Sequence, residues 1–217
     1  EGELSDNLIV KAYRMLSADH ILPHINFNLE KHIPSQAGLG GGSSDATYTL
    51  RLLNKLCQLN LNSATLHQYA VRLGADCAFF VTATPAFATG IGDILEPMNA
   101  ECAHLHGMYL LIVKPTVAIS TAQAFAFVKP QPTLIKCKDI VAQPVNSEWR
   151  NHLTNNFEVS AFKLHPEMHT IKEQLYNMGA LYAQMSGSGS AFFGIFNTPP
   201  TLTANHFNGM FTYLCQL

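Results

Sequence analysis

Hydrophobic residues recur along much of this chain every three or four positions, the spacing that forms one face of a helix. In the segment 43–57, Leu50 and Leu53 lie on such a face. The same spacing predicts helices over 7–16, 63–73, 153–162 and 169–178. Asp6 and Asn62 precede two of these segments, and we expect their side chains to cap the helices.

Other segments alternate between apolar and polar residues or run apolar throughout, as strands do. Residues 25–30 alternate and predict a half-buried strand, and 86–96 predict a hairpin around Gly90 and Gly92. Further strands are expected over 108–113, 181–186 and 191–196, a strand or helix over 207–217, and a turn over 129–132. Helices and strands alternate without a regular strand–helix–strand rhythm, which predicts an α+β fold.

The composition is that of a folded chain with a large core. The 217 residues suit one large or two small domains, and 47% are hydrophobic against 13% charged. These shares exclude disorder over most of the chain. The net charge of −2 provides no basic surface, so we expect no nucleic-acid partner. The apolar runs are too short to span a bilayer, so we expect no membrane insertion.

The cysteines and histidines are candidates for disulfides and metal ligands. The five cysteines are widely spaced without a C-x-x-C pair, which predicts free thiols in a reducing, cytoplasmic compartment. Among the ten histidines only His104 and His106 lie close together. Without a third clustered ligand, this pair does not predict a zinc site.

A glycine-rich segment leading into a helix is the strongest chemical signal. It comprises Pro34, Ser35, Gln36, Ala37, Gly38, Leu39, Gly40, Gly41, Gly42, Ser43 and Ser44. Glycine lets a ligand approach the backbone closely, and a helix start offers free N–H donors with partial positive charge. The segment therefore predicts a phosphate cradle. The alternative is a flexible surface loop before a serine-capped helix.

Two familiar nucleotide-binding loops do not fit this segment. A Walker A loop requires lysine directly after its last glycine, and Gly42 is followed by Ser43. The dinucleotide-binding fingerprint requires glycine at the position of Ser43. If the segment binds phosphate, it belongs to another class of loop.

Two further segments carry possible chemistry. Asp76 stands between a helix stop and an apolar run, where a carboxylate must be paired or hydrogen-bonded if it is buried. It could equally be the N-cap of a helix over 77–81. The small residues of 186–190 lie between two predicted strands and let another backbone or a ligand approach closely; the alternative is a tight hairpin.

Residues 34–46, 73–76 and 185–189 resemble, in order and spacing, three motifs of the GHMP kinases. The resemblance implies an incomplete ribosomal-protein-S5-like ATP-binding domain over 1–98 and a ferredoxin-like substrate domain over 99–217. Within this superfamily, four other segments resemble the kinases of cytidine-diphosphate-linked methylerythritol. These segments are 6–12, 87–90, 114–125 and 155–158.

The resemblance implies transfer of the ATP γ-phosphate to the 2-hydroxyl of that substrate, a step of non-mevalonate isoprenoid precursor synthesis, with ATP and Mg²⁺ as cofactors. It implies that 34–44 binds ATP and that Asp76 is catalytic. It also implies substrate contacts for Thr121, Phe125, Gly187, Ser188 and Gly189. Metal ligands and oligomeric state are left open.

The chain departs from the family pattern in several places. No segment of 1–30 matches the family's opening strand with its catalytic lysine or the following Asp-Gly-Tyr-His stretch, so we expect a further segment upstream. Gln36, Ala78 and Asn156 replace the more usual glycine, proline and aspartate. Two alternatives remain: a GHMP kinase of another small alcohol, or a non-catalytic nucleotide-binding protein that lacks the lysine. Phe125 with Thr121 favours a substrate that carries a base.

Overall fold

The computed structural model describes residues 3–129 and 135–217. By its internal contacts the chain divides into two compact units. Unit 1 comprises Glu1–His32 and Gly40–Asn99, and unit 2 comprises Ile33–Leu39 and Ala100–Leu217. The short segment before Gly40 therefore belongs with the C-terminal part of the chain. The domain boundary between 98 and 99 stays a prediction.

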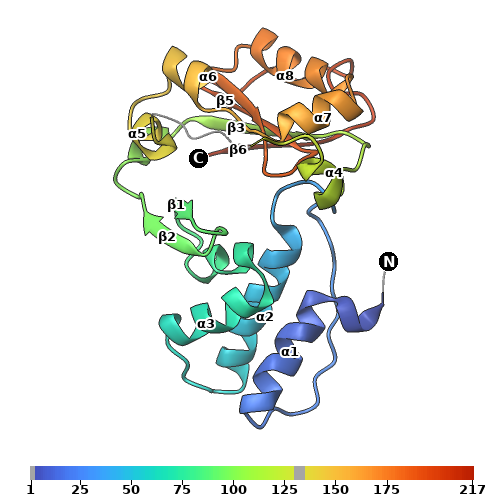
Figure 1. Ribbon diagram of the computed structural model, residues 1–217, viewed down its shortest axis with the longest axis vertical. Helices are drawn as coiled ribbons and strands as arrows, with labels where there is room; N and C mark the ends of the chain where they lie inside the picture. Colours follow the sequence, from blue (N-terminus) through green and yellow to red (C-terminus); the bar gives the residue numbers. More distant parts are fainter. Residues whose placement is uncertain (1–2, 130–134) are drawn as a thin grey trace. The chain divides into compact units, whose positions relative to one another are not determined.

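Unit 1 is built from three helices and a hairpin (Figure 1). The elements are α1 (Leu8–Asp19), α2 (Gly41–Leu56), α3 (Ser63–Leu73), β1 (Ala86–Thr89) and β2 (Ile94–Pro97). The two strands pair antiparallel, which confirms the hairpin predicted around Gly90 and Gly92. The helices bury their apolar faces in one core, which includes Ala12, Leu16, Ala46, Leu50, Leu53, Leu66 and Ala70. The hydrophobic spacing thus identifies the buried faces correctly.

The caps of the helices in unit 1 follow the expected chemistry with one shift. Asn62 caps α3 by accepting a hydrogen bond from the Thr65 N–H at 2.9 Å, which confirms the prediction. The cap of α1 is Asn7, which accepts from the Ile9 N–H at 2.9 Å, so the prediction of Asp6 was wrong by one residue. Asp6 instead ends a short 3₁₀ turn, and its carboxylate pairs with Lys11.

Two predicted elements are wrong in whole or part. Residues 25–30 form no strand, because they pair with no other segment in the part of the chain that the structure describes. Alternation alone cannot supply the hydrogen-bonded ladder that makes a strand. The predicted helix over 153–162 is split: α6 (Ser147–His152) ends before it, and α7 (Glu158–Leu164) begins within it. Asn155 interrupts the helix and bonds to other backbone groups.

Unit 2 contains an antiparallel sheet in the order β4-β5-β3-β6. Its strands are β3 (Tyr109–Lys114), β4 (Tyr182–Met185), β5 (Phe192–Phe196) and β6 (Phe211–Gln216). These strands confirm the apolar segments as strands and resolve the tail as a strand. Of the predicted turn over 129–132, residues 130–132 lie outside the described residues.

Helices cover this sheet, with α7 and α8 (Met168–Asn177) lying along it in Figure 1. Leu111 and Val113 of β3 join the core with these helices, whereas the intervening Leu110 packs with Trp149 of α6 in a second cluster. The remaining helices are α4 (Thr121–Phe125) and α5 (Cys137–Val141). Helices and an antiparallel sheet together confirm the α+β prediction.

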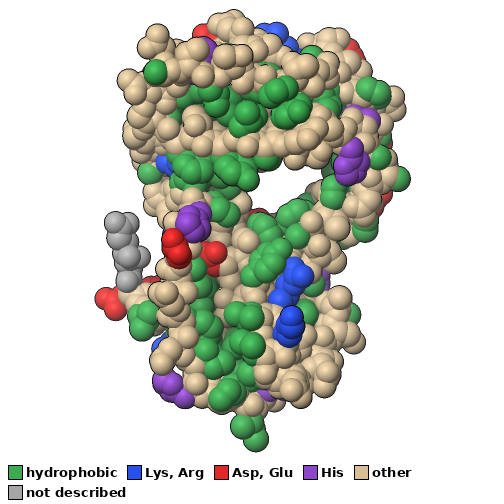
Figure 2. All heavy atoms as spheres, turned by 180° about the vertical axis from the view of Figure 1, so that it is seen from behind, with side chains coloured by type: hydrophobic (Ala, Val, Ile, Leu, Met, Phe, Trp, Pro, Cys, Tyr) green, Lys and Arg blue, Asp and Glu red, His purple; other side chains and the backbone are tan. Residues whose placement is uncertain are grey.

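Hydrophobic side chains also reach the surface of both units (Figure 2). In unit 1 the exposed ones include Leu52 and Leu56 of α2, and in unit 2 Tyr213 of β6. All five cysteines are free thiols, as predicted. Within residues 3–129 and 135–217, no helix combines the length and apolar character needed to cross a membrane.

Candidate functional site

The first half of the glycine-rich segment, up to Leu39, pairs with the loop between β4 and β5 inside unit 2. The backbone N–H of Ala191 donates to the Ala37 carbonyl oxygen at 3.0 Å, and that of Ser190 to Gln36 at 3.3 Å. The Ser186 hydroxyl donates to the Gly38 carbonyl oxygen at 2.8 Å. Two of the three segments that resemble kinase motifs therefore lie in direct contact.

Gly38 fits this contact only because it has no side chain. Its φ of +69° lies in the left-handed region. A Cβ built on it would lie 2.1 Å from the Ser186 carbonyl oxygen and 2.9 Å from the Gly189 nitrogen. The opposing Gly187 is less tightly enclosed, but its Cβ would still lie 3.1 Å from the Gly38 carbonyl oxygen. The glycines of both segments thus allow the two backbones to approach each other closely.

Side chains behind the β4–β5 loop hold it in place, and sequence reasoning assigned them no role. The Asn155 amide donates to the carbonyl oxygens of Met185 and Gly187, at 2.8 and 2.7 Å. Glu158, almost buried at the start of α7, accepts from the Met185 N–H at 3.0 Å and from Lys172 at 2.8 Å. A buried acidic residue in 155–158 with a lysine downstream is too weak a signal to predict such a network.

The second half of the glycine-rich segment begins α2 in unit 1. Gly40 occupies the N-cap position with φ +65° and offers no side chain to cap the helix. By contrast, Asn7, Asn62 and Ser120 cap α1, α3 and α4 with side-chain oxygens. The N–H donors at the start of α2 therefore have no capping side chain, and a helix start of this kind attracts anions. The hydroxyls of Ser43 and Ser44 lie in this first turn.

An ion pair joins the chain before the glycine-rich segment to α2. The Lys31 ammonium contacts the Asp45 carboxylate, one turn into the helix. The Lys31 and Asp45 side chains are 39% and 25% exposed, so both remain accessible to solvent. Sequence reasoning gave neither residue a role, because charges 14 positions apart carry no spacing signal.

Asp76 lies in the 3₁₀ turn Ala75–Cys77 of unit 1 and is exposed. Its side chain makes no hydrogen bond or ion pair with the described residues. The alternative of an N-cap is wrong, because neither this turn nor the following 3₁₀ turn, Phe79–Val81, is capped by a side chain. The condition that would require a partner for the carboxylate, burial, is not met: Asp76 is exposed, and it is the neighbouring Cys77 that is buried. The Asp76 side chain is therefore open to solvent.

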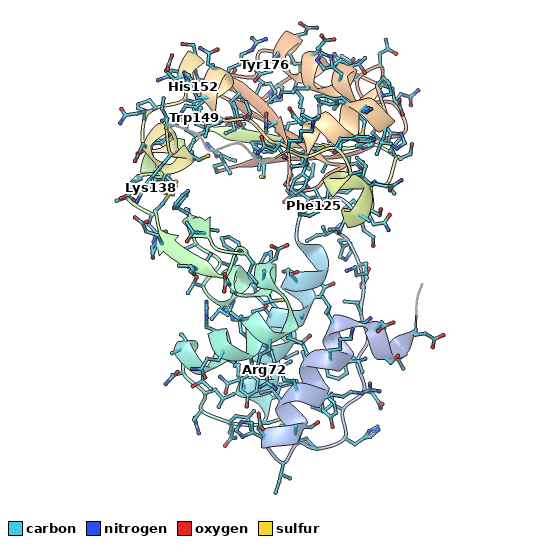
Figure 3. The ribbon with its side chains drawn as sticks, viewed as in Figure 1. Arg72, Phe125, Lys138, Trp149, His152 and Tyr176 are labelled. Carbon is cyan, nitrogen blue, oxygen red and sulfur yellow. The ribbon has the colours of Figure 1, made fainter. Side chains whose placement is uncertain are left out.

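Thr121 and Phe125 begin and end α4 in unit 2. A capping box of Ser120 and Gln123 fixes the start of this short helix. Phe125 lies on α4 in Figure 3. Its side chain is 59% exposed, and its ring meets that of Phe157 edge to face, with centroids 4.9 Å apart. An exposed ring held by a second ring offers a flat face for stacking.

The structure thus assembles the predicted site residues in two groups. Unit 1 holds Gly40–Ser44 and Asp76, and unit 2 holds Pro34–Leu39, Thr121, Phe125 and Gly187–Gly189. The described part of the chain contains no cluster of three His, Cys, Asp or Glu residues able to hold a metal ion.

Comparison with known proteins places these motifs in a family. The chain matches the GHMP kinases N terminal domain over residues 7–84 and the GHMP kinases C terminal domain over 136–204. It is 46% identical over 216 residues to the 4-diphosphocytidyl-2-C-methyl-D-erythritol kinase of Bacteroides fragilis, covering 100% of this chain and 77% of that protein. The enzyme of the same name from Bacteroides thetaiotaomicron is 49% identical over 201 residues, covering 93% of this chain and 72% of that one.

Solved structures give the same result. A crystal structure of 4-(cytidine 5'-diphospho)-2C-methyl-D-erythritol kinase matches with a TM-score of 0.73 and 30% identity, covering 92% of this chain and 72% of that chain. A homoserine kinase from Cytophaga hutchinsonii matches with a TM-score of 0.67 and 16% identity, covering 100% and 78%. The second likeness is one of fold alone.

Proposed function

This chain belongs to the GHMP kinases, in the family of 4-diphosphocytidyl-2-C-methyl-D-erythritol kinases, and from this premise we propose which residues bind each substrate and which take part in the transfer. The reaction is transfer of the γ-phosphate of ATP to the 2-hydroxyl of 4-(cytidine 5'-diphospho)-2-C-methyl-D-erythritol. The product serves isoprenoid precursor synthesis by the non-mevalonate route, in the cytoplasm.

The observation that carries the proposal is the start of α2. Its N–H donors have no capping side chain, and glycines precede it. A triphosphate supplies the negative charge and acceptor oxygens that such a helix start favours. We assign the phosphates of ATP to Gly40–Ser44, with Pro34–Leu39 completing the binding segment.

Asp76 is assigned to the acceptor hydroxyl. Phosphoryl transfer needs mainly positioning, charge neutralisation and one group that orients the hydroxyl or accepts its proton. An exposed carboxylate without a protein partner can play that role. Burial keeps the neighbouring Cys77 thiol protonated by raising its pKa, against the opposing effect of hydrogen bonds with Ser43 and Thr47. The thiol therefore adds no charge beside Asp76.

Mg²⁺ fits the oxygen donors of unit 1. Hard cations prefer carboxylate and hydroxyl oxygens and usually share their shell with substrate phosphates. Asp76 and the Ser44 hydroxyl are donors of this kind, as is Asp45, whose carboxylate also contacts Lys31. When bound, the ion would neutralise charge on the transferred phosphoryl group.

The cytidine is assigned to α4, and further substrate contacts to the β4–β5 loop. Phe125 presents a ring for stacking against the base, and Thr121 a hydroxyl four residues earlier. Gly187, Ser188 and Gly189 supply backbone groups in the loop that pairs with Gly38. A small alcohol such as homoserine carries no base that could stack on this ring. The fold likeness to homoserine kinase therefore does not favour that substrate.

The test is a coupled assay of ADP release on the purified protein. We expect turnover with 4-(cytidine 5'-diphospho)-2-C-methyl-D-erythritol, and none with homoserine or mevalonate. Phosphorus NMR of the product would locate the new phosphate on the 2-hydroxyl. Preferred turnover of another alcohol would overturn the substrate assignment and leave the fold unaffected.

A further inference from the structure

A buried hydroxyl on α2 holds the turn that carries Asp76. Thr47 is fully buried, and its Oγ1 donates to the Cys77 carbonyl oxygen at 2.8 Å, 30 positions along the chain. Thr49, two residues further on α2, is also buried, but its hydroxyl bonds only to the Asp45 carbonyl oxygen of its own helix. Of these two hydroxyls, only that of Thr47 joins α2 to another segment.

The turn around Asp76 depends on such support. It is one turn of 3₁₀ helix, in which the Cys77 N–H donates to the Gly74 carbonyl oxygen at 3.0 Å. The Asp76 side chain makes no bond of its own with the described residues. Its position is therefore set through the backbone of Cys77, the next residue, which is completely buried.

The same helix presents the donors that we assign to ATP. Gly41 begins α2, and Thr47 follows six residues later, about 9 Å along the helix axis. One rigid element thus fixes both the proposed phosphate site at its start and the Asp76 turn on its side. Transfer depends on the distance between these two places, and a misplacement of about 1 Å can cost about a hundredfold in rate.

We propose that Thr47 is a positioning residue for phosphoryl transfer: its hydroxyl fixes the Asp76 turn against α2, so that the carboxylate meets the acceptor hydroxyl in register with the bound triphosphate. The proposal rests on the proposed function of Asp76. It predicts a loss in kcat with little change in KM, because neither ATP nor the alcohol contacts Thr47.

The test replaces the hydroxyl without changing the shape of the side chain. We expect Thr47→Val to lower kcat by about ten- to a hundredfold, with KM for both substrates within about threefold. Thr47→Ser, which keeps the hydroxyl, should restore most of the rate. Thr49→Val is the matched control on the same helix and should leave kcat within about twofold, because its hydroxyl bonds only within α2.

A double-mutant cycle separates positioning from simple stabilisation. If Thr47 acts through Asp76, adding Thr47→Val to Asp76→Asn should lower kcat by less than about twofold further. An equal loss in both backgrounds would overturn the proposal, as would wild-type kcat in Thr47→Val. If Thr47→Val does not fold, Thr47→Ala enters the same cycle, because it adds no bulk and the same two outcomes apply.

The failure of this inference is distinguishable from that of the proposed function. A wild-type protein without activity on 4-(cytidine 5'-diphospho)-2-C-methyl-D-erythritol would overturn both. An active wild type whose Asp76→Asn variant loses kcat, while Thr47→Val keeps it, would overturn the role of Thr47 alone.

Discussion

The Ser186 hydroxyl donates a hydrogen bond to the Gly38 carbonyl oxygen at 2.8 Å, across 148 positions of sequence. The bond ties the glycine-rich segment to the β4–β5 loop in unit 2. Gly38 has φ +69°, and a Cβ on it would collide with the Ser186 carbonyl oxygen at 2.1 Å. Backbone geometry and close approach therefore both require glycine at this position.

Replacing Gly38 should disrupt the ATP-binding segment. We expect Gly38→Ala to weaken ATP binding at least about tenfold, or ~1.4 kcal/mol, measured by calorimetry. Gly209→Ala is the matched control, because Gly209 also has positive φ (+74°) but its Cβ would meet nothing within 4 Å. Equal ATP affinity in both variants would show that the contact with Ser186 does not shape the ATP site.

Asp76→Asn should remove the group that serves the acceptor hydroxyl. We expect kcat to fall by about 10²–10⁴-fold, with much smaller changes in both KM values. Asp139→Asn, at an exposed carboxylate of α5, should leave steady-state kinetics unchanged. A kcat within about threefold of wild type for Asp76→Asn would remove Asp76 from the mechanism.

Phe125→Ala should weaken binding of the cytidine substrate and spare ATP. Base–aromatic stacking contributes about 1–3 kcal/mol, and the Phe125 ring is 59% exposed. Tyr213→Ala, at a ring of β6 that is 55% exposed, is the control for loss of surface aromatic area. Equal losses for ATP and the cytidine substrate by calorimetry would mean that Phe125 supports the fold and does not face the base.

The sequence predicts those elements whose burial follows a simple period. The apolar strands and the helix faces of Leu50 and Leu53 could be identified because periodic burial leaves a periodic pattern. Residues 25–30 show the limit: the alternation is there, but a strand needs a partner, which local sequence does not encode. The prediction of a helix over 153–162 was partly wrong: Asn155 lies outside the helix, and its side-chain amide donates to the carbonyl oxygens of Met185 and Gly187.

The local structure of the candidate site was predictable where it depends on adjacent residues. The glycines before Ser43 mark a helix start open to anions, and that feature is readable from adjacent residues. The hydrogen bonds by which Thr47 and Glu158 hold Cys77 and Met185 could not be predicted from the sequence. They join residues 30 and 27 positions apart. Such bonds follow from the tertiary fold, and a lone buried hydroxyl or carboxylate has no pattern in sequence.

Lys114 should make stability depend on pH in the alkaline range. Burial lowers its pKa from the ordinary value of 10.5, and its ammonium donates to the carbonyl oxygens of Pro115 and Val117. Between the lowered pKa and 10.5 the unfolded chain binds more protons than the folded chain, so this group's contribution makes the free energy of unfolding rise with pH. Below that window both states are protonated, and the contribution is constant.

The measurement is denaturant unfolding from neutral pH up to 10.5, on wild type and Lys114→Met. Tyrosines and cysteines titrate in both proteins, so the difference between the two isolates Lys114. We expect wild type to gain stability relative to Lys114→Met as pH rises through the window. A difference that stays constant with pH would contradict a lowered pKa at Lys114.

The last prediction concerns Glu158 and Lys172 behind the β4–β5 loop. Their side chains are 12% and 21% exposed, and Glu158 also accepts the Met185 N–H. Lys172→Met leaves the carboxylate largely buried without its cation, and we expect a loss of about 3 kcal/mol in the free energy of unfolding. Glu158→Gln combined with Lys172→Met removes both charges and should cost less than Lys172→Met alone.

Chemical denaturation of the two variants and wild type tests this order of stabilities. Lys11→Met is the control, because its pair with Asp6 is exposed at 45% and 76% and should contribute less than about 1 kcal/mol. If the double variant were less stable than Lys172→Met, the charged carboxylate of Glu158 would stabilise the protein through its hydrogen bond with the Met185 N–H even without Lys172. The expected order instead identifies Lys172 as the cation that makes a carboxylate tolerable there, and so allows Glu158 to hold the end of β4 from which the loop opposite Gly38 begins.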